Sequence, residues 1–393
     1  MSDASVGYSA ATRLRTGTRD DVRAALVAQR ARTLALAQRY VDALGPDLAV
    51  PYDPGLNPPR WELGHVAWFQ DWWIARNRQR PLGVRCDPLH PRPPATLAGA
   101  DDWFDSSRIA HRPRWSLPLP PLGGLRQWMD ETFAATLGLL DALPPDAGDD
   151  DLYFFRLVCL HEAMHAEAAC YMARRLGFAV PLPPRPVGPP SALQVPAQAF
   201  DLGWQGAGFA FDNELQPRTV ALAAFEIDAV PVTWARYAAF VDAGGYQQRD
   251  WWTADGWQWR QRERQHPPRL PRGHDAAVHL SCHEAEAWCR WAGRRLPSEA
   301  EWECAALTAP GFAWGQAWEW TASTFQGWPG FVAHPYRDYS QPWFGRPRVL
   351  RGACAATSEV LAHPRYRNFF DPWRSDIFAG FRSCALPAPA VAV

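Results

Sequence analysis

The sequence predicts an α+β protein in which an N-terminal four-helix bundle precedes an α+β domain rich in irregular loops. Apolar residues recur at helical spacing through residues 1–178, proline is dense in 179–197, and short β-type runs with glycine and tryptophan mark 198–393. At 393 residues the chain is also too long for one ordinary core. We therefore expect a helical domain at 1–178, a linker at 179–197 and a second domain at 198–393.

Four segments of the first half have helical periodicity. The first follows Thr18, a favourable N-cap residue, and the second has proline in its first turn. In the fourth, acidic residues lie at the start and arginines near the end, as the helix dipole prefers, and Gly177 can close the helix. The expected helices cover residues 18–44, 58–78, 122–143 and 151–176.

The second half has a different local pattern. Short β-type runs are separated by loops, and no internal repeat is evident. The expected strands are 200–202, 218–222, 225–232 and 348–351, with helices at 233–243 and 283–292.

Composition favours a small-molecule partner. The formal net charge is −1 and no block of lysine and arginine occurs, which argues against nucleic acid and anionic membranes as partners. No apolar run approaches the roughly 18 residues that span a bilayer, and residues 1–15 do not resemble a secretion signal. We expect a cytoplasmic protein.

The eight cysteines do not suggest a metal knuckle or a disulfide framework. They include no CxxC pair and are spread along the whole chain. Most should be small buried apolar residues.

Two histidines have the spacing of metal ligands. His161 and His165 lie four residues apart, so on a helix they share one face. Glu167 is rotated by about 200° from His165 and points away from that face. The third ligand must therefore come from elsewhere. His65, on another expected helix, would ordinarily be a core residue, but it becomes a candidate because this metal set is incomplete.

Several phrases of the second half together resemble the formylglycine-generating, sulfatase-modifying family. They are FDLG at 200–203, VPVT at 230–233, GRRLPSEAEWE at 293–303, WEWT at 318–321, VLRG at 349–352 and GFR at 380–382. This resemblance implies a C-type-lectin-like α+β domain. The first half, with the pattern HxxxHxE, resembles a DinB-like four-helix bundle.

That pair of domains, in that order, is similar to the architecture of the ergothioneine-type sulfoxide synthases. The resemblance implies a mononuclear non-haem Fe(II) enzyme that uses O2 to join a chalcogen to C2 of the imidazole of hercynine, the trimethylated betaine of histidine. The family's iron ligands fall on His65, His161 and His165, which would leave open positions on Fe(II). Glu162 and Glu167 are candidates for holding an imidazole N–H, with a solvated or ion-paired helix position as the alternative.

The resemblance also implies substrate-binding and catalytic residues. Asn368 matches an asparagine that helps hold hercynine, and Phe369 could face its trimethylammonium group through cation–π attraction. Tyr336 and Tyr339 resemble a pair of active-site tyrosines, one of which donates a proton. We favour Tyr336 as the donor without excluding Tyr339, and simple packing of both is an equal alternative.

Departures from the family pattern point to a changed substrate. Met164 replaces a glutamine that contacts hercynine, and Phe370 replaces an acidic residue that helps bind the cysteine-containing donor. The phrases at 57–65 and 105–115 resemble the related selenoneine synthases, which join a selenosugar to hercynine. Candidates for contacting a sugar or a carboxylate are Arg112, Arg114 and Arg374, with surface salt bridges as the alternative.

The sequence thus predicts an oxygen-dependent non-haem iron enzyme that forms a carbon–selenium bond at hercynine C2. Its pocket should lie between the two domains. The first rival is an ergothioneine-type sulfoxide synthase that uses cysteine or γ-glutamylcysteine as a thiol donor. A rival of another class is a non-catalytic ligand-binding protein. A formylglycine-generating enzyme is disfavoured, since that chemistry has no role for the bundle and its histidines.

Overall fold

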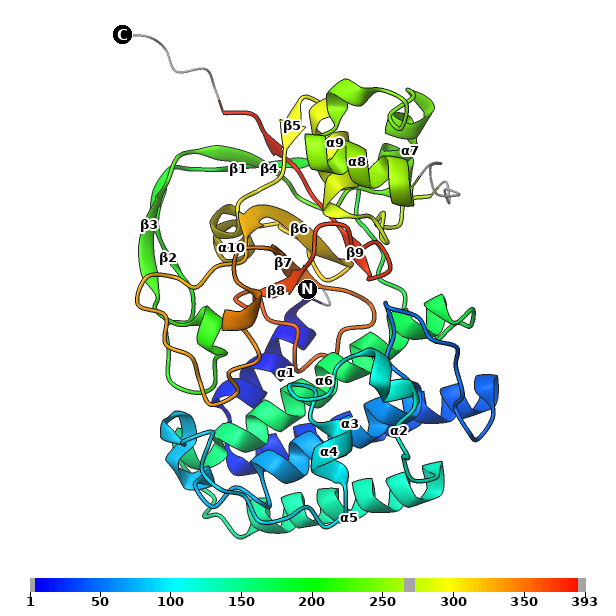
Figure 1. Cartoon of the computed structure of the whole chain (residues 1–393). Helices are drawn as coiled ribbons and strands as arrows, with labels where there is room; N and C mark the ends of the chain where they lie inside the picture. Colours follow the sequence, from blue (N-terminus) through cyan, green and yellow to red (C-terminus); the bar gives the residue numbers. More distant parts are fainter. Residues whose placement is uncertain (1–3, 265–272, 388–393) are drawn as a thin grey trace.

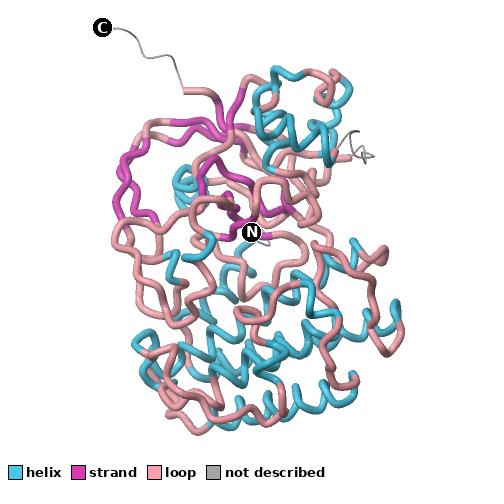
Figure 2. Tube along the Cα trace, in the orientation of Figure 1, coloured by secondary structure: helices cyan, strands magenta, loops and turns pink. Residues whose placement is uncertain are grey.

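The computed structural model describes residues 4–264 and 273–387. Helices make up its first half, and strands, short helices and long loops make up the second (Figures 1 and 2). The helices of the first half are α1 (Ala4–Thr16), α2 (Arg19–Leu44), α3 (Pro59–Trp73), α4 (Ala100–Phe104), α5 (Leu122–Asp141) and α6 (Asp149–Arg175). Two short 3₁₀ helices, η1 (Arg80–Arg85) and η2 (Arg112–Trp115), lie in the connections.

The four expected helices correspond to α2, α3, α5 and α6. Thr18 caps α2, because its backbone N–H donates to Asp21 and its hydroxyl accepts from the Asp21 N–H. Gly177, with a φ of 89°, follows the end of α6 as expected. The expected second helix was too long at its C-terminal end, since α3 stops at Trp73. Helix α1 and the five-residue α4 were not predicted.

One buried arginine ties the bundle together. Arg30 of α2 pairs with Glu162 of α6 at 2.9 Å. Its other nitrogens donate to the Gln70 side chain of α3 at 2.8 Å and to the Met129 carbonyl of α5 at 2.9 Å. A single guanidinium therefore bonds all three of the other long helices, which satisfies its charge and its hydrogen-bond donors in the interior.

The described residues of the second half form three sheets. One has the order β1 (Ala192–Val195), β4 (Phe225–Asp228), β10 (Cys384–Ala385) and β5 (Arg294–Arg295). The hairpin β2 (Gln198–Leu202) and β3 (Arg218–Leu222) forms the second. The third has the order β8 (Asn368–Phe370), β7 (Arg348–Ala353), β6 (Ala317–Thr324) and β9 (Ala379–Gly380), in which only the β6–β9 pair is parallel.

Short helices surround these sheets. They are α7 (Trp234–Asp242), α8 (Ala254–Glu263), α9 (Cys282–Trp291) and α10 (Glu299–Thr308), with 3₁₀ turns η3 (Asp212–Glu214), η4 (Arg249–Trp251) and η5 (Gln341–Trp343). The expected helices at 233–243 and 283–292 match α7 and α9. The expected strand 225–232 ends early at Asp228, because the chain leaves the sheet before the Thr233 N-cap of α7. The segment 179–197, expected to be a linker, includes β1.

Buried contacts join the two halves. Arg15 of α1 forms a bidentate pair with Glu214, at 2.7 and 2.9 Å, and both side chains are fully buried. The Glu167 carboxylate of α6 accepts from Trp318 Nε1 and from the Thr357 hydroxyl, each at 2.6 Å. The two halves thus share polar contacts as well as one continuous apolar core.

The cysteines and the helices were both the subject of expectations from composition. All eight cysteines are buried and free, as expected for small apolar residues. Within residues 4–264 and 273–387, every helix is too short or too polar to cross a membrane.

Candidate functional site

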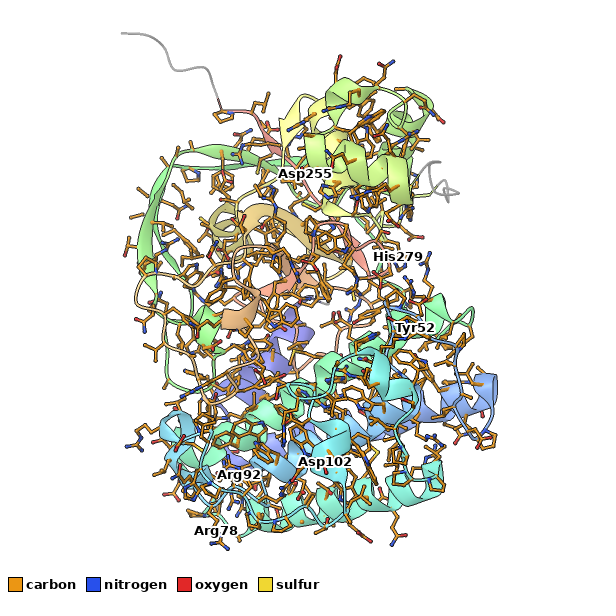
Figure 3. The ribbon with its side chains drawn as sticks, viewed as in Figure 1. Tyr52, Arg78, Arg92, Asp102, Asp255 and His279 are labelled. Carbon is orange, nitrogen blue, oxygen red and sulfur yellow. The ribbon has the colours of Figure 1, made fainter. Side chains whose placement is uncertain are left out.

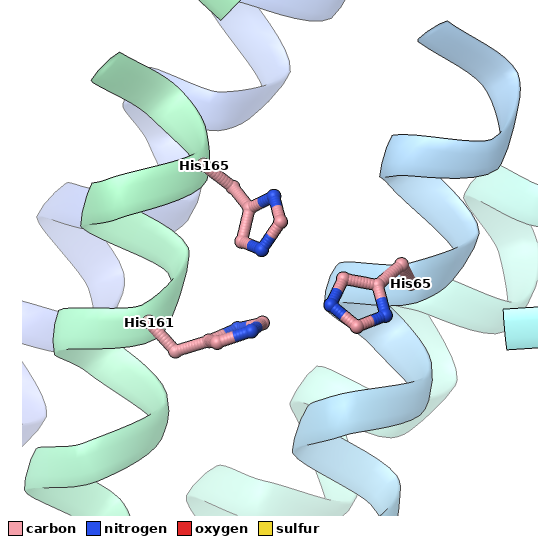
Figure 4. Close-up of side chains that lie close together, drawn as sticks. All are labelled: His65, His161 and His165. Atoms are coloured by element: carbon pink, nitrogen blue, oxygen red, sulfur yellow. The ribbon is translucent and has the colours of Figure 1, made fainter. Parts of the chain in front are cut away.

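The predicted metal ligands converge between α3 and α6. His65 comes from α3, and His161 and His165 come from successive turns of α6 (Figure 4). One ligand nitrogen from each ring lies within 4.8 Å of the other two. The ring centroids are 4.5 Å apart for His161 and His165, and 5.1 and 4.9 Å from His65 to each of them. The spacing of four residues on one helix therefore places two imidazoles opposite the third.

Hydrogen bonds fix the orientation of two of the three rings. His65 Nδ1 donates to the Phe104 carbonyl at 2.7 Å, and His165 Nδ1 donates to Glu62 Oε2 at 2.5 Å. These contacts leave Nε2 of each ring free to bind a metal. His161 Nε2 is buried and has no hydrogen-bond partner among the described residues. A buried nitrogen without a partner is costly in a core, so this donor set fits a metal ion.

Burial favours the neutral form of two of the clustered histidines, His65 and His161. Burial, with a contribution from His165, lowers the pKa of His65 to about 3. Burial also lowers the pKa of His161 well below its ordinary value. Burial alone would raise the pKa of Glu62, but the imidazole of His165 and its hydrogen bond outweigh burial and lower that pKa to about 2. A neutral histidine is the form that binds a metal.

The residue that supports His165 is not the one expected from sequence. Glu62 holds its Nδ1–H, whereas Glu162 is ion-paired with Arg30 and Glu167 faces Trp318 and Thr357. Neither Glu162 nor Glu167 therefore holds an imidazole. Glu162 takes the expected alternative, an ion-paired helix position, and Glu167 is bonded to the second half. The rotation of Glu167 away from the cluster was correctly expected. Glu62 could have been found from its spacing, because it lies three residues before His65 and so near the same face of α3.

The cluster opens into a cavity of about 700 Å³ lined by both halves of the chain. That volume is typical of small-molecule sites. The helical half contributes the three histidines, Met164 and a polar loop that includes Ser106 and Arg114; the second half contributes Tyr336, Tyr339 and the residues around Asn368. Every predicted site residue lines this cavity except Arg112.

The two tyrosines differ in their surroundings. The Tyr339 hydroxyl is 2.9 Å from that of Tyr366, which in turn donates to Met164 Sδ at 3.4 Å. Tyr336 packs its ring edge on Phe69, 4.8 Å between centroids, and its hydroxyl bonds no described residue. Burial raises the pKa of both phenols, so both stay protonated near neutral pH. Of the two, only Tyr336 has a hydroxyl not already engaged by a described residue.

The residues expected to hold the substrate come from β8. Asn368 accepts from the Phe369 backbone N–H at 2.9 Å, and its side chain is half-buried at the cavity wall. Phe369 stacks on Phe325 at 3.9 Å between ring centroids and meets Tyr339 edge-on at 5.9 Å. Phe370 lines the same cavity. This strand therefore presents an aromatic wall with one amide group.

The three candidate arginines are in different environments. Arg112 is exposed and lies 4.9 Å above the ring of Tyr52, which is labelled at the level where the two halves meet in Figure 3. Arg114 lies 4.0 Å over Trp61 and bonds the Asn57 side chain. Arg374 is paired with Asp376 at 2.6 Å. Arg112 does not line the cavity, whereas Arg114 and Arg374 do. A substrate role for Arg112 stays a prediction.

Comparison with known families supports the interpretation of the second half. A family model described as a sulfatase-modifying factor enzyme 1-like domain matches residues 181–316. The matched segment contains β1 to β5, which are five of the ten labelled strands, and all four labelled α-helices of this half, α7 to α10. The DinB-like identity of the helical half stays a prediction.

Curated relatives cover nearly the whole chain. The hercynine oxygenase of Mycobacterium tuberculosis is 34% identical over 91% of this chain and 96% of its own length. That of Mycolicibacterium thermoresistibile is 32% identical over 91% of this chain and 93% of its own. The formylglycine-generating enzyme of Streptomyces coelicolor is 32% identical, but over only 36% of this chain and 57% of its own. The similarity to the two hercynine oxygenases therefore extends over nearly the full length of both chains, whereas the similarity to the formylglycine-generating enzyme covers only part of each.

Proposed function

Because this chain belongs to the hercynine oxygenase family, within the ergothioneine-type sulfoxide synthases, we propose that it is an oxygen-dependent non-haem iron enzyme acting on hercynine. The reaction replaces the hydrogen at C2 of the hercynine imidazole with a bond to a chalcogen atom of a second substrate, and O2 serves as the oxidant. The observation that carries this proposal is the cluster of His65, His161 and His165 at the wall of a cavity of about 700 Å³.

Three histidines would hold the metal. Their free nitrogens face one another and one of them, His161 Nε2, has no other partner among the described residues. A three-imidazole site leaves other coordination positions open, and when Fe(II) is bound it would supply the one-electron chemistry that O2 activation requires. The protein's own contribution is to keep His65 and His161 neutral, to orient the imidazoles and to bring the substrates together.

Side chains of the second half suit a betaine of histidine. Phe369 offers a ring face to a trimethylammonium group, and Asn368 offers a donor and an acceptor. Tyr336 lies 6.0 Å from His161 between ring centroids, so its hydroxyl would be close to the reacting atoms. We assign to Tyr336 the delivery of a proton during turnover, because burial keeps the phenol protonated and no described residue engages it.

We further propose that the second substrate is a selenosugar. The support is the resemblance of residues 57–65 and 105–115 to the selenoneine synthases, together with the replacements at Met164 and Phe370. Both replacements line the cavity, where they would act directly on substrate choice. Loss of an acidic contact for an amino-acid donor agrees with a change of substrate class.

The test is the mass of the product formed from hercynine, Fe(II), O2 and one donor at a time. The donors are a 1-seleno-N-acetylhexosamine, cysteine and γ-glutamylcysteine. Product formed with the selenosugar at a far higher rate supports the full proposal. Product formed only with the thiols would replace it with an ergothioneine-type sulfoxide synthase.

A protein that only binds ligand is the alternative of another class. Isothermal titration showing hercynine binding, with no product from any donor, would favour it. A His161→Ala variant gives the matched control for catalysis, because it should fold and lose turnover. Full activity in that variant would rule out the three-histidine mechanism.

A further inference from the structure

A chain of side-chain hydrogen bonds leads from the cavity wall to one of the clustered histidines. Arg114 Nη1 donates to Asn57 Oδ1 at 2.9 Å, and Asn57 Nδ2 donates to Glu62 Oε1 at 2.5 Å. The other carboxylate oxygen of Glu62 accepts from His165 Nδ1 at 2.5 Å. We call these four residues the Arg114 relay. Arg114 comes from η2, Asn57 from the loop before α3, Glu62 from α3 and His165 from α6.

The direction of the relay is fixed by chemistry. Arginine can only donate and an ionised carboxylate can only accept, so the amide of Asn57 must turn its oxygen toward Arg114 and its nitrogen toward Glu62. Glu62 is buried, and each of its oxygens has one partner within the relay. Removing Arg114 would leave Asn57 free to rotate, and Glu62 would then lose a donor.

Arg114 also supports a second histidine by packing. Its guanidinium lies 4.0 Å from the centroid of the Trp61 ring, and Trp61 stacks on His65 with 4.9 Å between centroids and 8° between planes. The Ile109 carbonyl accepts from Arg114 Nη2 at 3.1 Å and holds the guanidinium in place. Arg114 therefore contacts Trp61, which packs on His65, and Asn57, which is linked to His165 through Glu62.

We propose that Arg114 is a positioning residue for the metal site and acts on His165 through Asn57 and Glu62. This inference rests on the proposed function, since it takes the three histidines to be the metal ligands. The carboxylate of Glu62 fixes the His165 tautomer and makes its Nε2 a better metal ligand. Asn57 and Arg114 in turn fix the orientation of that carboxylate. The arginine thus has a role separate from any contact with substrate.

The test is cobalt binding by the metal-free full chain and its variants Glu62→Gln, Asn57→Leu and Arg114→Gln. Loss of a residue that orients a ligand typically weakens metal affinity by about 10- to 100-fold. We expect Glu62→Gln to lie in that range, and Asn57→Leu and Arg114→Gln to weaken cobalt affinity several-fold, with a changed visible spectrum of bound Co(II). Arg114→Lys should recover part of the loss, because lysine can still donate to Asn57.

Arg108→Gln is the matched control. Arg108 is an exposed arginine of the same loop and does not line the cavity. This variant removes the same charge and should bind cobalt as the parent does. Thermal melting of the metal-free proteins will show whether any variant has merely lost its fold.

The outcomes separate this inference from the proposed function. Cobalt affinity and spectrum unchanged in Arg114→Gln would overturn the relay, even if Glu62→Gln were weakened. An equal loss in Arg108→Gln would also overturn it, because the effect would then be one of net charge. If the relay variants behave as expected but no hercynine product forms with any donor, the relay stands and the proposed function fails. A parent protein that takes up no cobalt overturns both.

Discussion

The hydroxyl groups of Tyr339 and Tyr366 are 2.9 Å apart and bond each other at the wall of the cavity. This pairing leaves Tyr336 as the member of the predicted tyrosine pair whose hydroxyl is not engaged by a described residue. The two tyrosines therefore lend themselves to a direct comparison by substitution.

We expect Tyr336→Phe to lower kcat strongly and to change the KM for hercynine little. Loss of a positioned proton donor typically costs about 10²- to 10⁴-fold in rate. Tyr339→Phe should instead lose about 1 kcal/mol of stability, because it removes one buried hydrogen bond. Steady-state kinetics and urea unfolding of both variants are the measurement. A larger loss of kcat in Tyr339→Phe would exchange the two roles.

Phe369 should contribute to the affinity for hercynine through its charge-attracting ring face. A cation–π contact is worth about 0.5–2 kcal/mol, or roughly 2- to 30-fold in Kd. We expect Phe369→Leu to weaken hercynine binding by this amount in calorimetry, with little effect on the affinity for 3-(imidazol-4-yl)propionate, which lacks the cationic group. Equal losses for both ligands would show that the effect is one of packing.

The choice of donor should respond to the two replaced positions. We expect the double variant Met164→Gln, Phe370→Asp to shift preference toward cysteine and γ-glutamylcysteine, because it introduces the amide and the carboxylate that the resemblance to the sulfoxide synthases implies at these positions. The measurement is a competition assay with selenosugar and thiol together, read by product mass. An unchanged product ratio would mean that the donor is selected elsewhere in the cavity.

The bundle should depend on the Arg30–Glu162 pair. Removing one partner of a buried ion pair typically costs about 3–5 kcal/mol, because the other charge is left uncompensated. Arg30→Met should lower the free energy of unfolding by this amount in urea titrations. Its matched control is Arg23→Met, since the Arg23–Asp141 pair has side chains 44% and 46% exposed and should contribute less than about 1 kcal/mol. Similar losses in both variants would contradict this reasoning.

Glu299 should make the second half sensitive to acid. Burial alone would raise its pKa, but the charges of Arg367 and Arg351 outweigh burial and hold the pKa below its usual value. A carboxyl with a depressed folded pKa stabilises the protein above its unfolded pKa of about 4.3, and this stability is lost as the pH falls through the folded pKa. We expect Glu299→Gln to be less stable than the parent at pH 7, with the difference shrinking below about pH 4. A constant difference across this range would contradict the assignment.

Local signals explain what the sequence could predict. The long helices have an apolar period, α2 has a capping threonine at Thr18, and two of the clustered histidines are one turn apart on α6. Short-range rules place these residues without knowledge of the fold. The strand β6 was missed although Trp318 to Thr321 alternate between apolar and polar residues. In the folded protein all four are buried, so the polar members lie inside as well.

Contacts between distant segments explain most of what the sequence could not predict. Glu62 and His165 are 103 positions apart, and Tyr339 and Tyr366 belong to separate loops. The Arg114 relay needs the loop before α3, the loop after α4 and the helix α6 to meet at one place. The spacing of residues along the chain does not predict that these segments contact one another. The contact is seen only in the folded structure.

The anchoring of Glu167 limits how this protein can be recombined. Its carboxylate lies two residues from His165 and is satisfied entirely by donors of the other half, Trp318 and Thr357. A chimera that joins this bundle to a foreign partner domain would have to keep both donors or bury an unsatisfied carboxylate beside the histidine cluster. The two halves are thus exchangeable only as a matched pair, although each carries its own part of the site.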